Sequence, residues 1–242
     1  MDPKILSDLT STGTLRAGLN MANTFLVTGK TSDGEPDGVA PDMAREIARR
    51  LGVGVSLVPF PSPGEVADAG NDGLWDIALI GAEPARAETI DFTAAYVEIE
   101  ATYLVPRDSP FKTIQDVDRD GVRIAVSGRS AYDLYLARNL KHAELVRAKG
   151  VGGAVELFVK DGLDAIAGLR PALAPEAEKL PGARLLDGCF TAVQQAIGTQ
   201  RGKPAGAEFL AEFVEDAKAS GLVARLVERH GVAGRLSVAR RG

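Results

Sequence analysis

The amino-acid sequence predicts an α/β fold with a largely parallel sheet. Apolar runs of strand length alternate along the chain with stretches of helix length, which is the order found in β-α-β units. The run at residues 76–80 is apolar after its first residue, as expected of a strand buried on both faces of such a sheet. The 242 residues suffice for one large domain or two smaller ones.

The first half of the chain begins with a predicted strand at Thr14–Leu19, after a polar N-terminal turn. A loop rich in Gly, Asp and Pro follows, and Pro41 then begins a helix. Apolar residues recur in this helix every four positions, until Gly52 ends it. The other predicted strands of this half are residues 55–60, 76–80 and 101–105.

The same alternation begins again near residue 110. Strands are predicted at residues 122–126, 144–147, 165–168, 183–186 and 193–197. Helices are predicted at residues 113–117, from about residue 131 onward, and at 152–160, 204–220 and 222–230. The basic segment Arg235–Arg241 is expected to be a frayed, solvated end rather than a binding arm.

Composition excludes several classes of function. The formal net charge of −5 disfavours nucleic acid and anionic membranes as partners, because both require a basic surface. Cys189 is the single cysteine, which excludes an internal disulfide, and the separation of His142 from His230 argues against a His-based zinc site. We therefore expect no metal and no cofactor. No run approaches the ~20 apolar residues of a membrane span, so no membrane insertion is expected.

The N-terminal residues lack the basic start, the apolar run and the small-residue cleavage site of a secretory signal. Two interpretations stay open. Either a leader has been removed and a methionine added, or the protein stays in the cytoplasm.

No motif of a known enzyme class is recognisable. The sequence has no GxSxG elbow, P-loop, HExxH or GxGxxG, and its cysteine has no histidine nearby. None of the acidic residues forms a recognisable catalytic pair. We therefore expect a protein that binds its ligand without transforming it.

The most informative segment is residues 75–96. The predicted buried strand ends at Gly81, where the missing side chain lets a ligand approach backbone N–H groups. Ligands of open α/β sheets bind at the carboxyl ends of strands. Arg86 follows in the next turn, where a guanidinium fork and exposed backbone donors together form a carboxylate receptor. The alternative is that Arg86 pairs with Glu83 or Asp91 at the surface.

This segment resembles the signature of the type II periplasmic solute-binding proteins of ABC transporters, in the polar amino-acid family (solute-binding protein family 3). The matching residues are Arg86, the run Ile90-Asp91-Phe92-Thr93, and Tyr96. Further resemblances follow in the family's order along nearly the whole chain, at residues 13–18, 38–52, 124–130 and 161–166.

The resemblance implies a two-lobed periplasmic-binding-protein-like type II fold. Each lobe is then a mostly parallel sheet flanked by helices, and two crossover segments act as hinges. Lobe 1 is expected at residues 1–105 with 190–242, and lobe 2 at residues 106–189. The ligand is expected in the cleft between the lobes, which close on it by a hinge motion.

The resemblance also implies the protein's partners and location. It indicates a monomer in the periplasm that delivers a small organic acid or amino acid to an ABC permease. For a chain with no signal peptide in the given sequence, a cytoplasmic location is the alternative.

Two departures from the family pattern concern the ligand. The family arginine grips the ligand α-carboxylate, which implies Arg86 as a ligand contact, with N–H groups near Gly81 and Glu83. Glu83, however, stands where the family has threonine. The acid that usually holds the α-amine in lobe 2 is missing from residues 165–170, where Arg170 is cationic. Either Glu83 holds the amine, or the ligand lacks an amine and carries a second anionic group near Arg170 or Arg129.

The remaining candidate residues each have a structural and a functional interpretation. Ser130 is expected to cap a helix, which contributes ~1 kcal/mol, and the same helix start is an anion site. Arg129 is a solvated loop charge or a second anion contact. Phe25 is an aromatic lid or a core residue, and Tyr132 a cleft wall or helix surface. Gln194 bonds to the hinge backbone or to the ligand.

The expected function is non-enzymatic capture of a small carboxylate-bearing, amino-acid-like molecule for an ABC transporter. One alternative is an enzyme on the same scaffold, because a few relatives resemble cyclohexadienyl dehydratases acting on prephenate or arogenate. Glu83 is then a general acid. The other alternative is a cytoplasmic ligand-sensing module.

Overall fold

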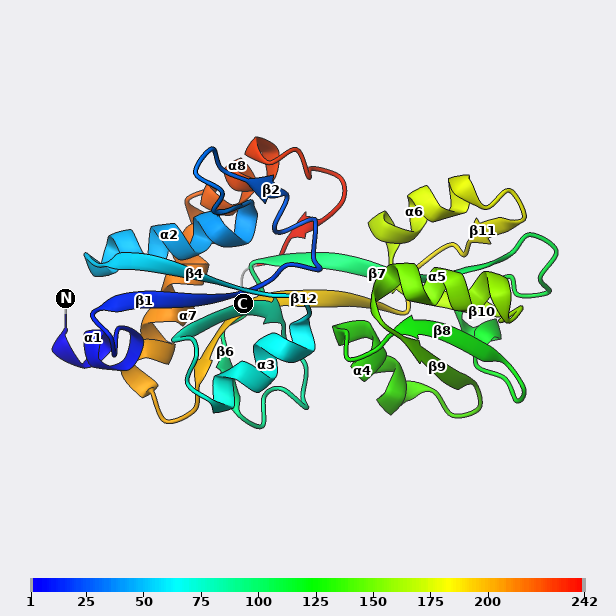
Figure 1. The fold of residues 1–242 in the computed structure, drawn as a ribbon, viewed down its shortest axis with the longest axis horizontal. Coiled ribbons are helices and arrows are strands. Elements are labelled where there is room, and N and C mark those ends of the chain that lie inside the picture. The colour runs from blue at the N-terminus through cyan, green and yellow to red at the C-terminus, as the bar shows by residue number, and fades with distance from the viewer. Residues whose placement is uncertain (1, 241–242) are drawn as a thin grey trace. The chain divides into compact units, whose positions relative to one another are not determined.

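The computed structural model describes residues 2–240, which form two compact units. Unit 1 contains the residues up to Glu98 and those from Gln194 onward, and unit 2 is Ile99–Val193. Two strands, β7 (Val97–Pro106) and β12 (Thr191–Gln200), carry the chain from one unit to the other (Figure 1). The lobe boundaries expected from the sequence fall near the end of β7 and just before β12.

Unit 1 contains a sheet with the strand order β4-β1-β5-β12. Strand β1 (Thr14–Asn20) pairs in parallel with β4 (Gly54–Phe60) and with β5 (Ile77–Gly81). Strand β12 runs antiparallel to β5 and also pairs with β6 (Ile90–Phe92). The other elements of unit 1 are α1 (Pro3–Leu9), β2 (Gly29–Lys30), β3 (Pro36–Asp37), α2 (Val39–Leu51), α3 (Pro63–Asn71), α7 (Pro204–Ala219), α8 (Leu222–Arg229) and β13 (Ser237–Val238).

Unit 2 contains a sheet with the strand order β7-β10-β8-β9. Strands β8 (Arg123–Ser127), β9 (Glu144–Ala148) and β10 (Ala165–Leu169) are parallel, and β7 is antiparallel to β10. The other elements of unit 2 are the 3₁₀ helix η1 (Ile114–Val117), α4 (Ala131–Asn139), α5 (Gly150–Lys160), α6 (Arg170–Lys179) and β11 (Ala183–Leu185), which pairs with β7.

The core of unit 1 forms where the sequence is most apolar. All five residues of β5 are buried, as predicted from the unbroken apolar run. Trp75, fully buried, precedes this strand and lies against Gly70 of α3, where a Cβ atom would stand 2.5 Å from the indole ring. Glycine at this position therefore permits α3 to pack closely on Trp75.

Several elements differ from the prediction. Helices α1, α3 and α6 were not predicted, and the apolar strand at residues 101–105 is the second half of the longer β7. The expectation that Arg235–Arg241 is frayed is wrong for its described part. Ser237 and Val238 pair with β7, and the N–H of Ala239 donates to the carbonyl of Tyr96. Arg241 lies outside the described residues.

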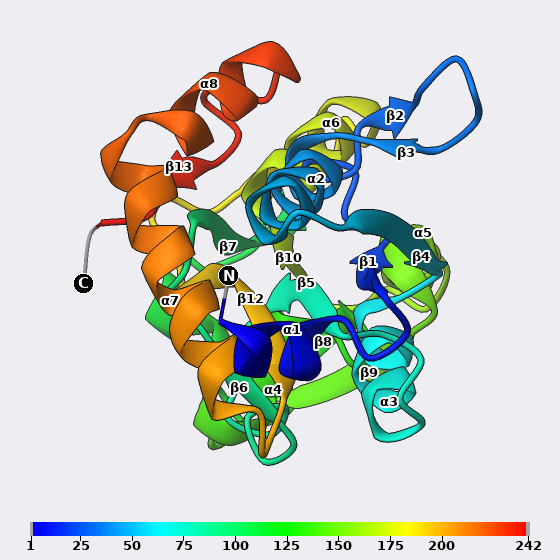
Figure 2. The same cartoon turned by 90° about the vertical axis from the view of Figure 1, so that its left-hand side faces the viewer.

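The first and the last described segments of unit 1 contact helix α7. Figure 2 shows α1 lying beside α7. The side chain of Leu9 lies so close to Gly206 of α7 that a Cβ atom there would stand 2.7 Å from it. Lys218 of α7 is buried and donates to the carbonyl oxygen of Arg240 at 2.9 Å. Within residues 2–240, none of the helices combines the length and the apolar character that crossing a bilayer requires.

Candidate functional site

In unit 1 the predicted residues gather at the carboxyl ends of the parallel strands. Asn20 at the end of β1 pairs with Phe60 at the end of β4, and Leu19 pairs with Leu79 of β5. The loops that leave β1 and β5 therefore begin at one edge of the sheet. This is the edge where open α/β sheets bind ligands. The loop after β1 contains Phe25, and the loop after β5 contains Glu83 and Arg86.

Arg86 is buried at this edge although it is charged. Its side chain and backbone together leave the residue 5% exposed, and Nη1 donates to the carbonyl oxygen of Gly81 at 2.6 Å. The guanidinium is thereby fixed to the last residue of β5. An arginine held in this way presents a rigid, planar set of donors with little freedom to lose when an anion binds. It does not extend into bulk solvent.

The turn around Arg86 is built by Glu83 and by strand β12. The carbonyl oxygen of Glu83 accepts the N–H groups of Arg86 and Ala87, both at 2.9 Å. The N–H of Ala82 donates to the carbonyl oxygen of Gln194 at 2.7 Å, which ties the turn to β12. The side chain of Glu83 is half-buried, and Gln194 is exposed while its neighbour Gln195 is buried. Gly81, Glu83, Arg86 and Gln194 thus lie together around one turn.

Phe25 lies in the neighbouring loop, which is a compact turn. The side chain of Asn23 accepts the N–H of Phe25 at 3.3 Å, and the carbonyl of Asn23 accepts the N–H groups of Leu26 and Val27. Phe25 is 8% exposed within a run of three buried apolar residues. This environment supports core packing of Phe25 in unit 1.

In unit 2 the predicted residues also follow the carboxyl ends of parallel strands. Ser127 ends β8, and the turn at residues 128–130 leads into α4. Ser130 caps this helix, because its Oγ accepts the N–H of Asp133 at 3.1 Å. Arg129 has a φ of 61°, the one positive φ among the described non-glycine residues. This backbone conformation is sterically unfavourable for any residue other than glycine.

A carboxylate of the protein itself lies at the start of α4. Asp133 is 2% exposed, and its Oδ2 accepts the N–H of Arg129 at 2.7 Å. Arg147 of β9 donates from Nε to both oxygens of Asp133, at 2.9 and 3.1 Å. A helix N-terminus attracts anions, and here Asp133 already supplies one. This arrangement favours a structural role for the helix start.

Tyr132 supports the same turn. It is 6% exposed, and its side chain hydrogen-bonds to Ser130 and Ser127. Burial raises the pKa of Tyr132 above its usual value, so the hydroxyl stays protonated. Tyr132 is therefore buried within unit 2, and the expectation that it lies on the helix surface is wrong.

Arg170 begins α6 at the end of β10, next to a residue that the sequence analysis missed. Its Nε donates to Oε2 of Glu100, on β7, at 2.9 Å. Its Nη2 donates to the carbonyl oxygens of Leu186 and Gly188. Glu100 gave no signal in the sequence beyond its place in the alternating run Val97-Glu98-Ile99-Glu100, because the pairing of β7 with β10 is not local.

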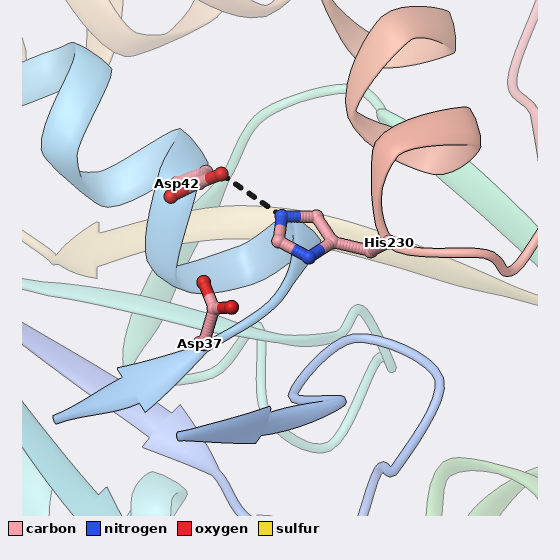
Figure 3. A group of neighbouring side chains, drawn as sticks. All are labelled: Asp37, Asp42 and His230. Carbon is pink, nitrogen blue, oxygen red and sulfur yellow. Dashed lines mark hydrogen bonds and ion pairs between the residues drawn. The ribbon is translucent and has the colours of Figure 1, made fainter. Parts of the chain in front are cut away.

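A separate cluster in unit 1 joins α2 to α8. Asp37, Asp42 and His230 offer ligand atoms that all lie within 4.8 Å of one another (Figure 3). The Nε2 atom of His230 lies 2.9 Å from Asp42 Oδ2. Arg45 and Arg229 also approach Asp42, at 2.9 and 3.3 Å, so two cations of the protein already offset the acidic charges. The cluster is therefore an ion-pair network.

Comparison with known proteins places the chain among solute-binding proteins. The profile of the bacterial extracellular solute-binding proteins, family 3, matches residues 21–233. The amino-acid-binding protein AabA of Dichelobacter nodosus is 23% identical over 137 residues, covering 56% of this chain and 54% of that protein. Cyclohexadienyl dehydratase of Pseudomonas aeruginosa is 26% identical over 148 residues, covering 56% of this chain and 55% of that enzyme. The match thus extends over about half the length of these curated relatives.

The fold has close counterparts among solved structures. One is the amino acid ABC transporter substrate-binding protein AbpA of Streptococcus pneumoniae, with a TM-score of 0.73 and 20% identity, covering 93% of this chain and 97% of AbpA. At that identity the likeness concerns the fold, which is that of the two-lobed type II periplasmic binding proteins. Since the profile match also covers most of the sequence, the chain belongs to the bacterial extracellular solute-binding proteins, family 3.

Proposed function

We propose that this protein captures a small, carboxylate-bearing, amino-acid-like ligand and passes it to an ABC permease, without catalysing a reaction. The family and the relative AabA, an amino-acid-binding protein, support this proposal. The periplasm as the location, a monomeric state and a ligand position between the lobes are parts of the same proposal.

The observation that carries the proposal is the buried arginine at the carboxyl edge of the unit 1 sheet. Arg86 is 5% exposed and anchored to Gly81 O at 2.6 Å, so its charge is fixed beside the end of β5. A fixed guanidinium in a poorly hydrated place binds a carboxylate through charge-assisted hydrogen bonds. Removing one partner of such a buried pair costs ~2–5 kcal/mol, which is roughly 30-fold in affinity at the lower end.

The test begins with a ligand screen. Thermal shift with L-amino acids, 2-oxo acids and dicarboxylates identifies a binder, since a ligand at 100 times its Kd adds ~2.7 kcal/mol of stability. Calorimetric titration then compares the wild type with Arg86→Lys and Arg86→Ala. We expect affinity to fall by roughly 30-fold or more in both variants, because lysine keeps the charge but loses the planar fork.

A matched control makes the same chemical change at an exposed arginine of unit 1. The side chain of Arg49 is 71% exposed and pairs with Glu46 within α2, so Arg49→Lys should leave affinity unchanged. If a folded Arg86→Lys variant binds the ligand with unchanged affinity, Arg86 is not part of the ligand site.

A dehydratase is the second candidate function. The match to cyclohexadienyl dehydratase favours it, together with the half-buried Glu83 in the Arg86 turn as a general acid. Incubation with prephenate and arogenate, followed by product analysis, distinguishes the two functions. We expect no turnover. Turnover that disappears in Glu83→Gln would replace the binding proposal with the enzymatic one.

A further inference from the structure

Unit 2 contains a pocket at the amino edge of its sheet, opposite the edge that holds Arg129 and Arg170. The end of α5, the start of β10 and the loop before β11 surround it, together with Pro106 at the end of β7 (Figure 1). Strand β10 has five residues and spans ~16 Å, so the length of the sheet separates the pocket from the predicted ligand residues of unit 2. The pocket volume is about 350 Å³, within the ~300–1,000 Å³ of small-molecule sites.

The pocket is an opening into the hydrophobic core of unit 2. All of its lining residues are apolar or glycine, and the side chains that form it are those of Pro106, Phe158, Val159, Leu163, Leu180 and Pro181. Phe158 and Leu163 belong to the core, whereas Val159 is 59% exposed. Gly162 and Gly182 complete the lining, and a Cβ atom at either would meet no heavy atom within 4 Å. A ligand in this pocket would remove apolar surface from water, which is favourable.

A cationic group borders the pocket at Arg107, which follows Pro106. The N–H of Arg107 donates to the carbonyl oxygen of Gly182 at 2.8 Å, and Nε donates to that of Pro181 at 3.3 Å. The guanidinium therefore lies beside the lining and uses one of its five N–H donors. Arg184 adds a second positive charge, since its Nε donates to the carbonyl oxygen of Arg107 at 3.2 Å. Within residues 2–240, neither arginine forms an ion pair with an acid.

The neighbouring acids do not neutralise Arg107. Asp108 and Asp161 adjoin the pocket residues in sequence, but their exposed carboxylates make no hydrogen bond or ion pair in the described part of the chain. Arg123 donates from Nη2 to a carbonyl oxygen of the pocket lining at 3.4 Å. Oδ2 of Asp164 accepts the N–H of Arg123 at 2.7 Å, which offsets part of the Arg123 charge. Arg107 is therefore the cation best placed to receive an anionic group.

We propose that this pocket binds a small amphipathic carboxylate, with its apolar chain against Phe158 and Val159 and its anionic group at Arg107. The apolar lining excludes a strongly polar ligand, because a polar group buried without a partner costs free energy. The remaining N–H donors of Arg107 favour an anionic head group over a neutral or cationic one. The proposal goes beyond amino-acid capture and does not depend on it.

A small molecule fits this surface better than a protein segment does. Val159 is the one exposed large apolar side chain in the described part of unit 2. A stable protein interface buries ~800 Å² on each partner around an apolar centre, which a single exposed valine does not supply.

Calorimetric titration tests the ligand class with probes that differ from octanoate in one property. We expect octanoate to bind about tenfold or more tightly than octan-1-ol and octylammonium, because these two probes lack the anionic group. Butanoate should also bind about tenfold or more weakly, since each buried CH₂ group contributes roughly fourfold in affinity. In a two-dimensional ¹H–¹⁵N spectrum, octanoate should shift the amide signals of Gly162 and Gly182.

Two pairs of variants locate the bound octanoate. Val159→Glu places a negative charge on the lining, and Val159→Gln is its neutral control of the same length. We expect the affinity to fall about tenfold further in Val159→Glu than in Val159→Gln. Arg107→Gln should lower the affinity by about tenfold or more. Arg138→Gln should retain it, because Arg138 donates to the carbonyl oxygen of Leu134 in α4 and lies outside the lining. Melting curves confirm that the variants are folded.

Several outcomes would overturn the proposal. If octanoate does not bind, or if Val159→Glu and Arg107→Gln bind it as tightly as the wild type does, the pocket is not a carboxylate site. Equal affinity for octylammonium would refute the role of Arg107. If Arg86→Lys rather than the pocket variants abolishes octanoate binding, the octanoate occupies the candidate site of unit 1. If an acidic, leucine-containing peptide shifts the Gly182 signal and octanoate does not, the occupant is a protein segment. None of these results changes the case for amino-acid capture, which Arg86 carries in unit 1.

Discussion

Replacing Asp76 with asparagine should destabilise unit 1 while leaving its ligand edge intact. Asp76 is fully buried immediately before β5. Its Oδ2 accepts the backbone N–H of Arg16 at 2.9 Å and Nε at 3.0 Å. Its Oδ1 accepts Nη2 of Arg16 at 2.7 Å and the hydroxyl of Ser11 at 3.1 Å. The carboxylate thereby joins the amino ends of β1 and β5.

The magnitude follows from this geometry. An asparagine replaces one carboxylate oxygen by an NH₂ group, so up to two of the four hydrogen bonds are lost. With the NH₂ group at the Oδ2 position, the bonds from Arg16 N and Nε are lost; at the Oδ1 position the bond from Arg16 Nη2 is lost, while the Ser11 hydroxyl can accept from the amide. In both orientations the remaining bonds from Arg16 lose a charged acceptor. At ~1.5 kcal/mol for each bond to a charged group, the loss is about 3 kcal/mol. This agrees with the lower end of the ~3–5 kcal/mol for breaking a buried ion pair. The lower end applies because water reaches the Arg16 side chain, which is 24% exposed.

Differential scanning calorimetry measures the effect. A destabilisation of ~3 kcal/mol lowers Tm by about 6–12 °C in a protein of this size. Asp72→Asn is the control, because Asp72 is an exposed residue at the end of α3 and should change Tm little. Ligand affinity at 25 °C should stay unchanged in both variants, since Asp76 and Arg86 lie at opposite ends of β5. A Tm of Asp76→Asn equal to that of the wild type would refute the reasoning.

Two further predictions concern single side chains. Tyr96 is fully buried and its hydroxyl has no hydrogen-bond partner in the described chain, so Tyr96→Phe should stabilise the protein by about 1 kcal/mol in chemical denaturation. Tyr132→Phe, which removes a hydrogen-bonded hydroxyl, should have the opposite sign, and equal signs would contradict the argument. Backbone N–H groups of residues 112 and 113 lower the pKa of Asp116 to about 2. The folded-state pKa is thus below the unfolded value of ~3.9, so the stabilisation is present above that pH and lost as pH falls toward 2. Measurements of unfolding free energy against pH should show Asp116→Asn less stable than the wild type at pH 7, with the difference closing as pH falls through about 2; a difference independent of pH would count against this assignment.

The alternation of strands and helices was predictable because its signals are local. The buried run of β5 and the four-residue spacing of α2 are contained in the residues themselves, and Gly52 ends α2 with a φ of 74°. Helix α3 was missed although Ser62 and Glu65 form an N-terminal signature before it. Its short, glycine-containing sequence has little helical periodicity. Its position against Trp75 explains its stability better than its propensity does.

The candidate site was predictable in part. The segment containing Gly81 and Arg86 was recognisable from the sequence as a candidate ligand site, because a buried strand, a glycine and an arginine follow one another within one short stretch. Arg170 was singled out as a cation that could meet a second anionic group of the ligand, but its ion-pair partner Glu100 is 70 positions earlier in the chain. Only the antiparallel pairing of β7 with β10 brings the two together.

The sequence by itself determined the α/β class, the order of most elements and the family to which the chain is assigned. Those properties depend on side-chain periodicity and on motifs that span a few residues. The tertiary structure decided which charges are neutralised: Asp133 by Arg147, Asp76 by Arg16 and Glu100 by Arg170. It also decided that the segment before Arg241 docks on β7 and α7. Burial and ion pairing depend on segments distant in sequence, and no local pattern encodes which of them meet.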